Sequence, residues 1–171
     1  MANWCRNTLA FEGNETALEQ IKSKFRRMIN LERSEQCGQL PDFVNPKVGV
    51  YFFDIIWDEG DCIFSCQTKW SQNTKVLVQI AERFNVDFIH DYEEMGNLVY
   101  GRSIYEDSIL TEIDVDGEDF EKYQYDDETG IYYFEREAYD SDAEILETLL
   151  ERKVRSRNEN AQLLQIAMQF D

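Results

Sequence analysis

The sequence contains few of the residues from which catalytic centres and metal sites are usually built. Its 171 residues include one histidine and four cysteines. Histidine is the usual general base in proteins, so a chain with only one offers little support for acid-base or nucleophilic catalysis. Four cysteines do not make a disulfide framework at this length, and we expect them to be reduced in a cytoplasmic protein.

Long apolar runs are also missing. No segment approaches the roughly 20 apolar residues that a membrane-spanning helix needs. The first residues lack a basic region followed by an apolar stretch, which a secretory signal would require. We therefore expect no membrane association.

Basic residues are scarce in the last third of the chain. Residues 106–151 contain eighteen Asp and Glu but only Lys122 and Arg136 as cations, a net charge of −16 in a chain of −18. Such a charge disfavours direct nucleic-acid binding, because phosphates repel carboxylates. A surface of one sign instead attracts and selects surfaces of the opposite sign.

The acidic stretch is nevertheless too aromatic to be a disordered tail. The whole chain is 43% hydrophobic and contains eleven Phe, nine Tyr and three Trp. Acidic disordered segments lack aromatic residues, whereas six aromatic residues lie between Phe120 and Phe134. The sequence therefore predicts a folded acidic region.

Hydrophobic periodicity predicts an α+β fold. Leu18, Ile21, Phe25 and Met28 fall on one stripe of a helix that opens after Gly13-Asn14, and a second helix is expected from an N-cap at Ser71. The region 31–47 lacks periodicity and is expected to be a loop. Strands are expected at residues 4–11, 48–56 (a central strand), 62–66, 86–91 and 98–105. The order βαββαβ plus one strand is the ferredoxin-like arrangement.

The acidic region is expected to extend this domain. Residues 120–125 and 131–136 flank a loop that ends in Gly130, which predicts a β-hairpin. A capping box at Ser141 opens a C-terminal helix, and the pattern leaves open whether residues 141–170 form one helix or two. We therefore expect a ferredoxin-like domain at 1–105 and an acidic hairpin and helix packed on it at 106–171.

Specific chemistry finds little support. His90 lies on an alternating strand without a catalytic motif around it, so a packing or edge role is expected. Cys62 and Cys66 would be about 13 Å apart on a straight strand, too far for one metal ion. The segment from Asp114 to Asp119 has its glycine in the wrong register for a calcium loop. The sequence predicts no catalytic residue, no metal site and no cofactor.

Two short motifs resemble a known family. The run NWCRNTL at residues 3–9 resembles the start of the YubB-type ferredoxin-like family of plasmids and phages. The runs TKW at 68–70 and YEEMG at 92–96, followed by Gly101, resemble its second landmark, so that the resemblance covers residues 1–105. The chain departs from the family at Ala2 and Ser71-Gln72, where members carry prolines. The resemblance implies a ferredoxin-like fold and a mobile-element origin in a bacterial host, and it transfers no catalytic residue.

These observations favour a non-enzymatic binding protein that imitates nucleic acid. Carboxylates on alternate strand positions would be about 6.6 Å apart, close to the spacing of about 6.8 Å between every second phosphate of DNA. The expected partner is a basic nucleic-acid-binding host protein, such as a defence enzyme of restriction or CRISPR type. The predicted contact residues are Asp114, Asp116, Glu118, Asp119, Glu121, Asp126, Asp127, Glu128, Glu135 and Glu137.

Other readings stay open at this point. The acidic surface could serve solubility alone, or the chain could be an adaptor that contacts its partner through exposed aromatic residues. Clustered carboxylates would also suit an enzyme that depends on a divalent metal. The three tryptophans Trp4, Trp57 and Trp70 are expected to pack in the core, and the pattern says nothing about the oligomeric state.

Overall fold

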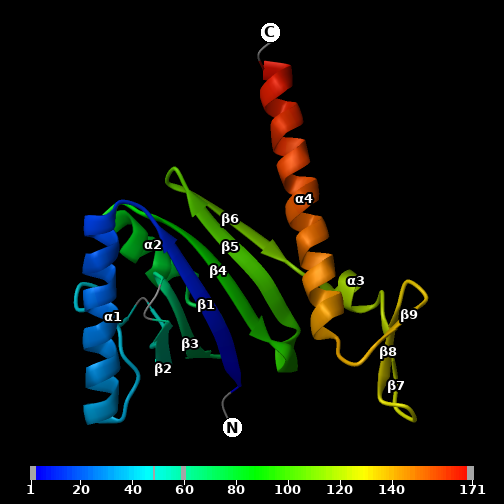
Figure 1. The fold of residues 1–171 in the computed structure, drawn as a ribbon, viewed down its shortest axis with the longest axis horizontal. Helices are drawn as coiled ribbons and strands as arrows, with labels where there is room; N and C mark the ends of the chain where they lie inside the picture. The colour runs from blue at the N-terminus through cyan, green and yellow to red at the C-terminus, as the bar shows by residue number, and fades with distance from the viewer. Residues whose placement is uncertain (1–2, 48, 59–60, 169–171) are drawn as a thin grey trace. The chain divides into compact units, whose positions relative to one another are not determined.

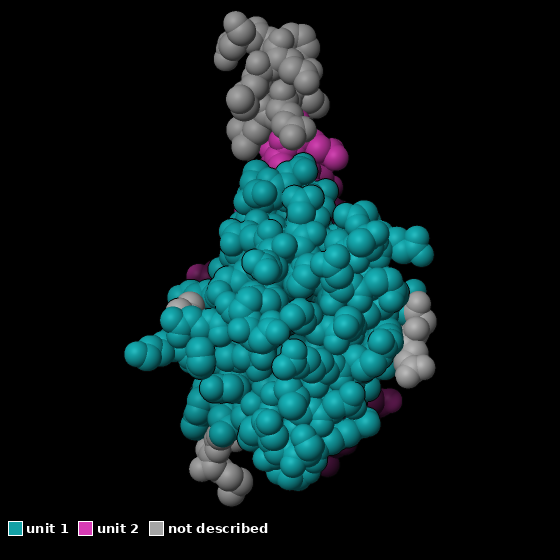
Figure 2. Space-filling model, turned by 90° about the vertical axis from the view of Figure 1, so that its left-hand side faces the viewer, with its two compact units in different colours: residues 1–112 teal, residues 113–171 magenta. Residues whose placement is uncertain are grey.

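The computed structural model describes residues 3–47, 49–58 and 61–168, with side chains described except at residue 58 and residues 163–168. The chain divides into two compact units, residues 1–112 and 113–171 (Figure 2). The division falls between Glu112 and Ile113, inside a strand, whereas the sequence suggested a boundary after residue 105. Each unit is described by itself below.

Unit 1 is built on an antiparallel sheet (Figure 1). Its strands are β1 (Trp4–Glu12), β2 (Phe53–Asp58), β3 (Ile63–Lys69), β4 (Asp87–Glu94), β5 (Val99–Glu106) and β6 (Ile109–Asp114), which runs across the unit boundary. The strand order β2-β3-β1-β4-β5-β6 contains the ferredoxin-like order in its first four strands. The predicted α+β fold is confirmed, and β5 is the predicted additional strand; the sheet continues with β6, which the sequence did not predict.

Two helices cover one face of this sheet (Figure 1). Helix α1 (Glu15–Glu35) begins where the side chain of Asn14 accepts a hydrogen bond from the Ala17 N–H, as expected for an N-cap. Helix α2 (Thr74–Phe84) begins at Thr74, so the predicted N-cap at Ser71 is wrong by two residues; Asn73 occupies that position. The region 31–47 is partly helical, because α1 continues to Glu35.

The core lies between the two helices and the alternating inward positions of the strands. Phe25 of α1 stacks on Phe64 of β3 with ring centroids 4.0 Å apart, and Phe11 of β1 contacts both rings. All three phenylalanines are at most 4% exposed. Each buried ring contributes roughly 2–3 kcal/mol through loss of apolar surface to water, and this cluster holds the sheet against α1.

The segment 48–56 is not a central strand. The strand there is β2, Phe53–Asp58, and it lies at the edge of the sheet. Its apolar character has a different cause: Phe52 and Ile55 point into the core, and the ring of Trp57 stacks on that of Phe64 at 6.0 Å. An edge strand that buries one face can be as hydrophobic as a central one, which explains the error.

Unit 2 contains a small meander and a long helix. After the one-turn helix α3 (Gly117–Phe120) come β7 (Gln124–Asp126), β8 (Ile131–Phe134) and β9 (Glu137–Tyr139), which form a three-stranded antiparallel sheet. Helix α4 (Ala143–Met168) is continuous, which settles the choice between one helix and two. It begins at Ala143, so Asp142 and not Ser141 precedes its first residue.

Candidate functional site

The ten predicted contact residues lie mostly outside strands. Asp114 ends β6, four residues surround α3, three lie at the β7–β8 loop, and Glu135 and Glu137 lie at the turn into β9. Of the described residues in β7, β8 and β9, only Asp126 and Glu137 are acidic. The expected rows of carboxylates on alternate strand positions are therefore not formed, because the acidic residues concentrate in the turns.

Asp116 and Asp119 cap helix α3. The Asp116 side chain accepts hydrogen bonds from the N–H groups of Glu118 and Asp119, and the Asp119 side chain accepts one from the Asp116 N–H at 3.0 Å. This reciprocal pattern is a capping box. The segment considered as a calcium loop is thus used to start a helix.

Cations neutralise the same two carboxylates. Lys153 of α4 contacts Asp116 at 2.6 Å and Asp119 at 2.5 Å, and Lys122 contacts Asp119 at 2.6 Å. The Asp119 side chain is only 3% exposed. Burial raises its pKa, but the hydrogen bonds from Lys122 and Lys153 outweigh burial and lower the pKa to about 2. This cluster, with the buried Asp119 at its centre, ties α3 to α4.

Glu135 is neutralised in the same way. Its carboxylate accepts two hydrogen bonds from the guanidinium of Arg152, at 2.6 and 2.8 Å, which lower the pKa of Glu135. The same guanidinium lies over the ring of Phe134 at 5.5 Å. Glu135 and Arg136 both adopt positive φ, the conformation of a two-residue hairpin turn. The pair therefore anchors the β8–β9 turn to α4.

The β7–β8 loop presents its carboxylates differently. Asp126 accepts hydrogen bonds from the N–H groups of Glu128 and Thr129, which shape the turn. A hydrogen bond from the Thr129 side chain, together with these N–H groups, lowers the pKa of Asp126. Gly130 then closes the loop at φ 72°, a conformation that glycine adopts without strain. Asp127 and Glu128, between them, are exposed. The Asp126 carboxylate therefore hydrogen-bonds to the backbone of its own loop, whereas Asp127 and Glu128 are exposed to solvent.

Two tyrosines accompany these outward carboxylates. Tyr125 and Tyr133 are exposed, and with Gln124 and residues 126–128 they line a hollow of about 580 Å³. The Tyr125 ring packs on that of Tyr132 at 4.6 Å, which limits its freedom. Tyrosine faces attract cations, and carboxylates beside them add charge. The hollow is chemically suited to basic side chains.

The structure thus separates the ten predicted residues into two sets. Asp116, Asp119 and Glu135 pair with cations, and Asp126 holds its loop. The other six, Asp114, Glu118, Glu121, Asp127, Glu128 and Glu137, are exposed, as Asp116 and Glu135 are too, and Glu137 accepts a hydrogen bond from the Tyr139 hydroxyl. Asp127 and Glu128 lie together at the hollow, whereas Glu118 and Glu121 flank α3.

Metal ligands are not clustered in the described part of the chain. Within it, no group of three or more His, Cys, Asp or Glu side chains is placed to hold an ion. Cys5, Cys62 and Cys66 are buried free thiols and Cys37 is an exposed one. Burial raises the pKa of Cys66 and raises that of Cys5 to about 11, so both thiols stay protonated near neutral pH.

Unit 1 contains a buried polar network that the sequence did not reveal. His90 is fully buried, and its Nε2 lies 2.9 Å from Asn7 Oδ1. The Asn7 amide donates to Thr68 Oγ1, whose hydroxyl donates to the Ser71 carbonyl. Burial lowers the pKa of His90 to about 3, so the imidazole is neutral at physiological pH. The expected packing role of His90 agrees with this position.

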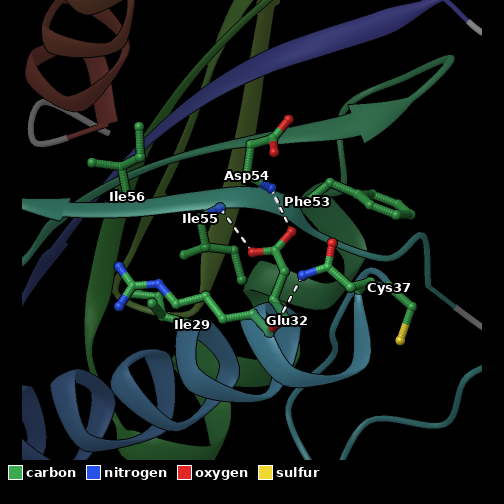
Figure 3. Close-up of a pocket in the computed structure, with 9 residues that line it drawn as sticks. Ile29, Glu32, Cys37, Phe53, Asp54, Ile55 and Ile56 are labelled. Carbon is green, nitrogen blue, oxygen red and sulfur yellow. Dashed lines mark hydrogen bonds between the residues drawn. The ribbon is translucent and has the colours of Figure 1, made fainter.

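A second hollow lies where the end of α1 meets the edge strand β2 (Figure 3). It measures about 450 Å³. The Glu32 carboxylate accepts hydrogen bonds from the N–H groups of Asp54 and Ile55, at 2.6 and 3.1 Å. The register of β2 shifts here and Asp54 adopts φ 49°, as at a β-bulge. Glu32 therefore satisfies backbone donors that the bulge leaves without a strand partner.

The tryptophans divide between core and surface. Trp57 stacks on Phe64, but Trp4 and Trp70 are exposed, so the expectation that all three pack in the core is wrong for these two. Trp4 makes an edge contact with Phe53 at 5.1 Å, and Lys69 lies over both rings. Trp70 adopts φ 74°, an uncommon conformation for a large side chain.

The fold defines an α+β protein with a ferredoxin-like sheet, and comparison with known families agrees. Residues 52–135 match a family model described as a ferredoxin-like domain in Api92-like protein. The match runs from the start of β2 into the acidic meander, and the NWCRNTL run at 3–9 lies outside it. No curated protein and no solved structure matches the chain. Among the described helices, none combines the length and the apolar character needed to cross a membrane.

Proposed function

We propose that this chain is a non-enzymatic binding protein whose acidic unit 2 competes with nucleic acid for a basic surface. The observation that supports the proposal is the β7–β8 loop, where Asp127 and Glu128 are exposed beside two exposed tyrosines. A partner's arginine or lysine can meet a carboxylate and an aromatic face there at once.

The cation-paired carboxylates have a different role in this proposal. Asp116, Asp119 and Glu135 fix α3 and the β8–β9 turn to α4 through Lys153 and Arg152. They hold the scaffold, and the exposed residues make the contact. The contact surface is thus smaller than the ten residues the sequence suggested, with Asp127 and Glu128 at its centre and Glu118, Glu121 and Glu137 as further contributors.

The partner class follows from charge and from the resemblance. A surface of concentrated carboxylates selects basic proteins, and the most extensive basic surfaces are those that bind nucleic acid. The resemblance to the YubB-type family of plasmids and phages supports a cytoplasmic role in a bacterial host, against a defence enzyme of restriction or CRISPR type. The competition would displace DNA from that enzyme.

A capture experiment tests the proposal. Immobilised chain should retain DNA-binding proteins from a bacterial lysate at about 50 mM salt and lose most of them at about 300 mM, because screening weakens charge pairing. Excess duplex DNA should elute the same proteins. The double substitution Asp127→Asn and Glu128→Gln should reduce capture at least tenfold.

A matched control separates the loop from total charge. Glu12→Gln with Glu82→Gln removes two exposed carboxylates from unit 1 and should leave capture within about twofold. Equal losses in the two double variants would show that net charge alone is responsible. If DNA does not release the captured proteins and both double variants still capture them, the result would favour an adaptor in which the exposed Trp4 and Trp70 make the contact.

A further inference from the structure

A third hollow, called the α2 hollow here, lies in unit 1 at the C-terminal end of α2. It measures about 430 Å³, which is within the range of small-molecule sites. Three segments line it: the last turn of α2, the start of β4 and the two-residue turn between β5 and β6. Its polar wall consists of Glu82, Asn85, Asp87, Tyr105, Asp107 and Ser108. All of these residues belong to unit 1.

The carboxylates of the α2 hollow lack a cation from the chain itself. Among the described residues, no Lys, Arg or His side chain forms an ion pair with Glu82, Asp87 or Asp107. Glu12 of β1 pairs with Asp87 across the sheet and adds a fourth carboxylate beside them. The end of α2 contributes as well, because the last carbonyls of a helix lack intrahelical partners and carry partial negative charge. The hollow therefore attracts cations.

A buried hydroxyl without a partner borders the same hollow. Tyr105 of β5 is only 6% exposed, and its ring stacks on that of Phe88 at 5.5 Å. Its hydroxyl forms no hydrogen bond with any described residue, although the residue lines the hollow. Buried polar groups are nearly always hydrogen-bonded. The unpaired hydroxyl is thus a second, independent indication that a polar ligand group belongs in the hollow.

The arrangement of the carboxylates favours an extended organic cation over a metal ion. In the described part of the chain, no three His, Cys, Asp or Glu side chains are placed to hold an ion, so these carboxylates surround a volume and do not meet at one point. A linear polyamine has several ammonium groups separated by short alkyl segments, and each ammonium donates up to three hydrogen bonds. Ala81 and Val86, both buried, give the alkyl segments an apolar wall.

We propose that the α2 hollow binds a linear polyamine such as spermidine. Its ammonium groups would pair with the carboxylates of Glu82, Asp87 and Asp107, and one of them would donate a hydrogen bond to the Tyr105 hydroxyl. This inference does not depend on the proposed function, because it concerns other residues, a different unit and a small molecule in place of a protein.

Titration of the isotope-labelled full chain with spermidine, followed by nuclear magnetic resonance, tests the site. The amide signals of residues 81–87 and 105–108 should shift together and saturate as expected for one site. Raising the salt from about 20 to about 200 mM should weaken the affinity at least about fivefold, because salt screens the charges. Shifts that rise without saturation, or that are as large in residues 124–128, would show general attraction to an acidic protein and would overturn the proposal.

Two conservative variants test the ligand groups. Asp107 adopts φ 50° in its turn, a conformation that suits asparagine equally well, so Asp107→Asn removes the charge and keeps the turn. We expect it to weaken spermidine binding at least about fivefold. Tyr105→Phe removes only the hydroxyl and should weaken binding about three- to tenfold, the effect of one hydrogen bond. Circular dichroism checks that both variants are folded.

Matched controls separate the hollow from total charge. Asp54→Asn makes the same change at another exposed aspartate with positive φ, 49°, and should leave the affinity within about 1.5-fold. Equal losses in Asp54→Asn and Asp107→Asn would overturn the proposal, and so would unchanged binding in Tyr105→Phe and Asp107→Asn. The Glu12→Gln and Glu82→Gln variant should weaken spermidine binding while it still captures protein, so failure here is distinct from failure of the proposed function.

Discussion

The two units differ in the polar groups that accompany their buried apolar side chains. Unit 1 buries aromatic rings and keeps its interior polar groups neutral, as the Asn7, His90 and Thr68 network shows. Unit 2 also buries apolar side chains, among them Phe134, Ile145 and Leu149, and adds ion pairs to them, with Lys153 between two carboxylates and Arg152 on a third. An excess of one charge can therefore build a scaffold as well as a binding surface, provided that a few cations are placed inside it.

The largest expected effect is the destabilisation of unit 1 by the loss of a buried aromatic ring. Phe25→Ala removes a ring that is 1% exposed and stacked at 4.0 Å on Phe64. We expect the free energy of unfolding to fall by about 3–5 kcal/mol, because apolar contact is lost and a cavity is left behind. Urea denaturation followed by tryptophan fluorescence measures it. Ile109→Ala, at an exposed position, is the control and should change little.

The second prediction concerns acid. His90 has a folded pKa of about 3 against an unfolded value near 6.5, so the unfolded chain binds the extra proton first. The neutral imidazole therefore makes its full contribution to the free energy of unfolding above about pH 6.5. This contribution declines by a few kcal/mol as the pH falls toward 3. His90→Gln, which keeps a donor toward Asn7, should flatten the decline between pH 6.5 and pH 4. An unchanged slope would contradict the buried neutral state.

The third prediction addresses the charge cluster of unit 2. Asp119→Asn should cost about 1.5–3 kcal/mol, since two lysines and a backbone N–H lose a charged acceptor. Hydrogen exchange should rise in α3 and in the adjoining turn of α4, while the sheet of unit 1 stays protected. Glu118→Gln changes an exposed neighbour and is the matched control. Equal exchange in both variants would show that the cluster does not stabilise unit 2.

The fourth prediction concerns the bulge at the sheet edge. Glu32→Gln leaves one acceptor oxygen for the two N–H groups of Asp54 and Ile55, so we expect a loss of about 1–2 kcal/mol. Exchange of these two amides should accelerate more than that of the core strands. If the protection of these amides is unchanged, water accepts hydrogen bonds from the two N–H groups as well as the Glu32 carboxylate does.

The smallest expected effect is that of Arg152→Gln. Its partner Glu135 is more than half exposed, and exposed ion pairs contribute about 0.2–1 kcal/mol. Loss of the contact with Phe134 adds to this. Thermal unfolding should shift by only a few degrees. If Arg152→Gln lowered the melting temperature as much as Asp119→Asn does, the exposed ion pair of Glu135 would stabilise unit 2 as strongly as the buried Asp119 does.

Local pattern was sufficient for most of the fold. The stripe from Leu18 to Met28 predicted α1, and alternation predicted β1, β4 and β5, because each element buries one face. The errors arose where local pattern is ambiguous. A buried edge strand looks like a central one at 48–56, and Ser71 looks like a cap although the chain turns again before Thr74.

The candidate site was less predictable because its pairings are distant in sequence. Lys153 meets Asp116 across 37 residues, and His90 meets Asn7 across 83. Composition does not distinguish a carboxylate that pairs with a cation of the same chain from one that a partner could bind. The tertiary structure shows that the carboxylates of Asp116, Asp119 and Glu135 pair with Lys and Arg side chains. The cations that follow residue 151 lie outside the acidic stretch in the sequence, and two of them, Arg152 and Lys153, reach back to the acidic segments.

Competition with duplex DNA tests the central claim most directly. A basic DNA-binding protein captured by the chain should be released by DNA and by about 300 mM salt, and the Asp127→Asn and Glu128→Gln double variant should fail to capture it. The account predicts that the Glu12→Gln and Glu82→Gln variant still captures it. If the loop variant captures as strongly as the unaltered chain, exposed carboxylates at the β7–β8 loop are not the binding surface.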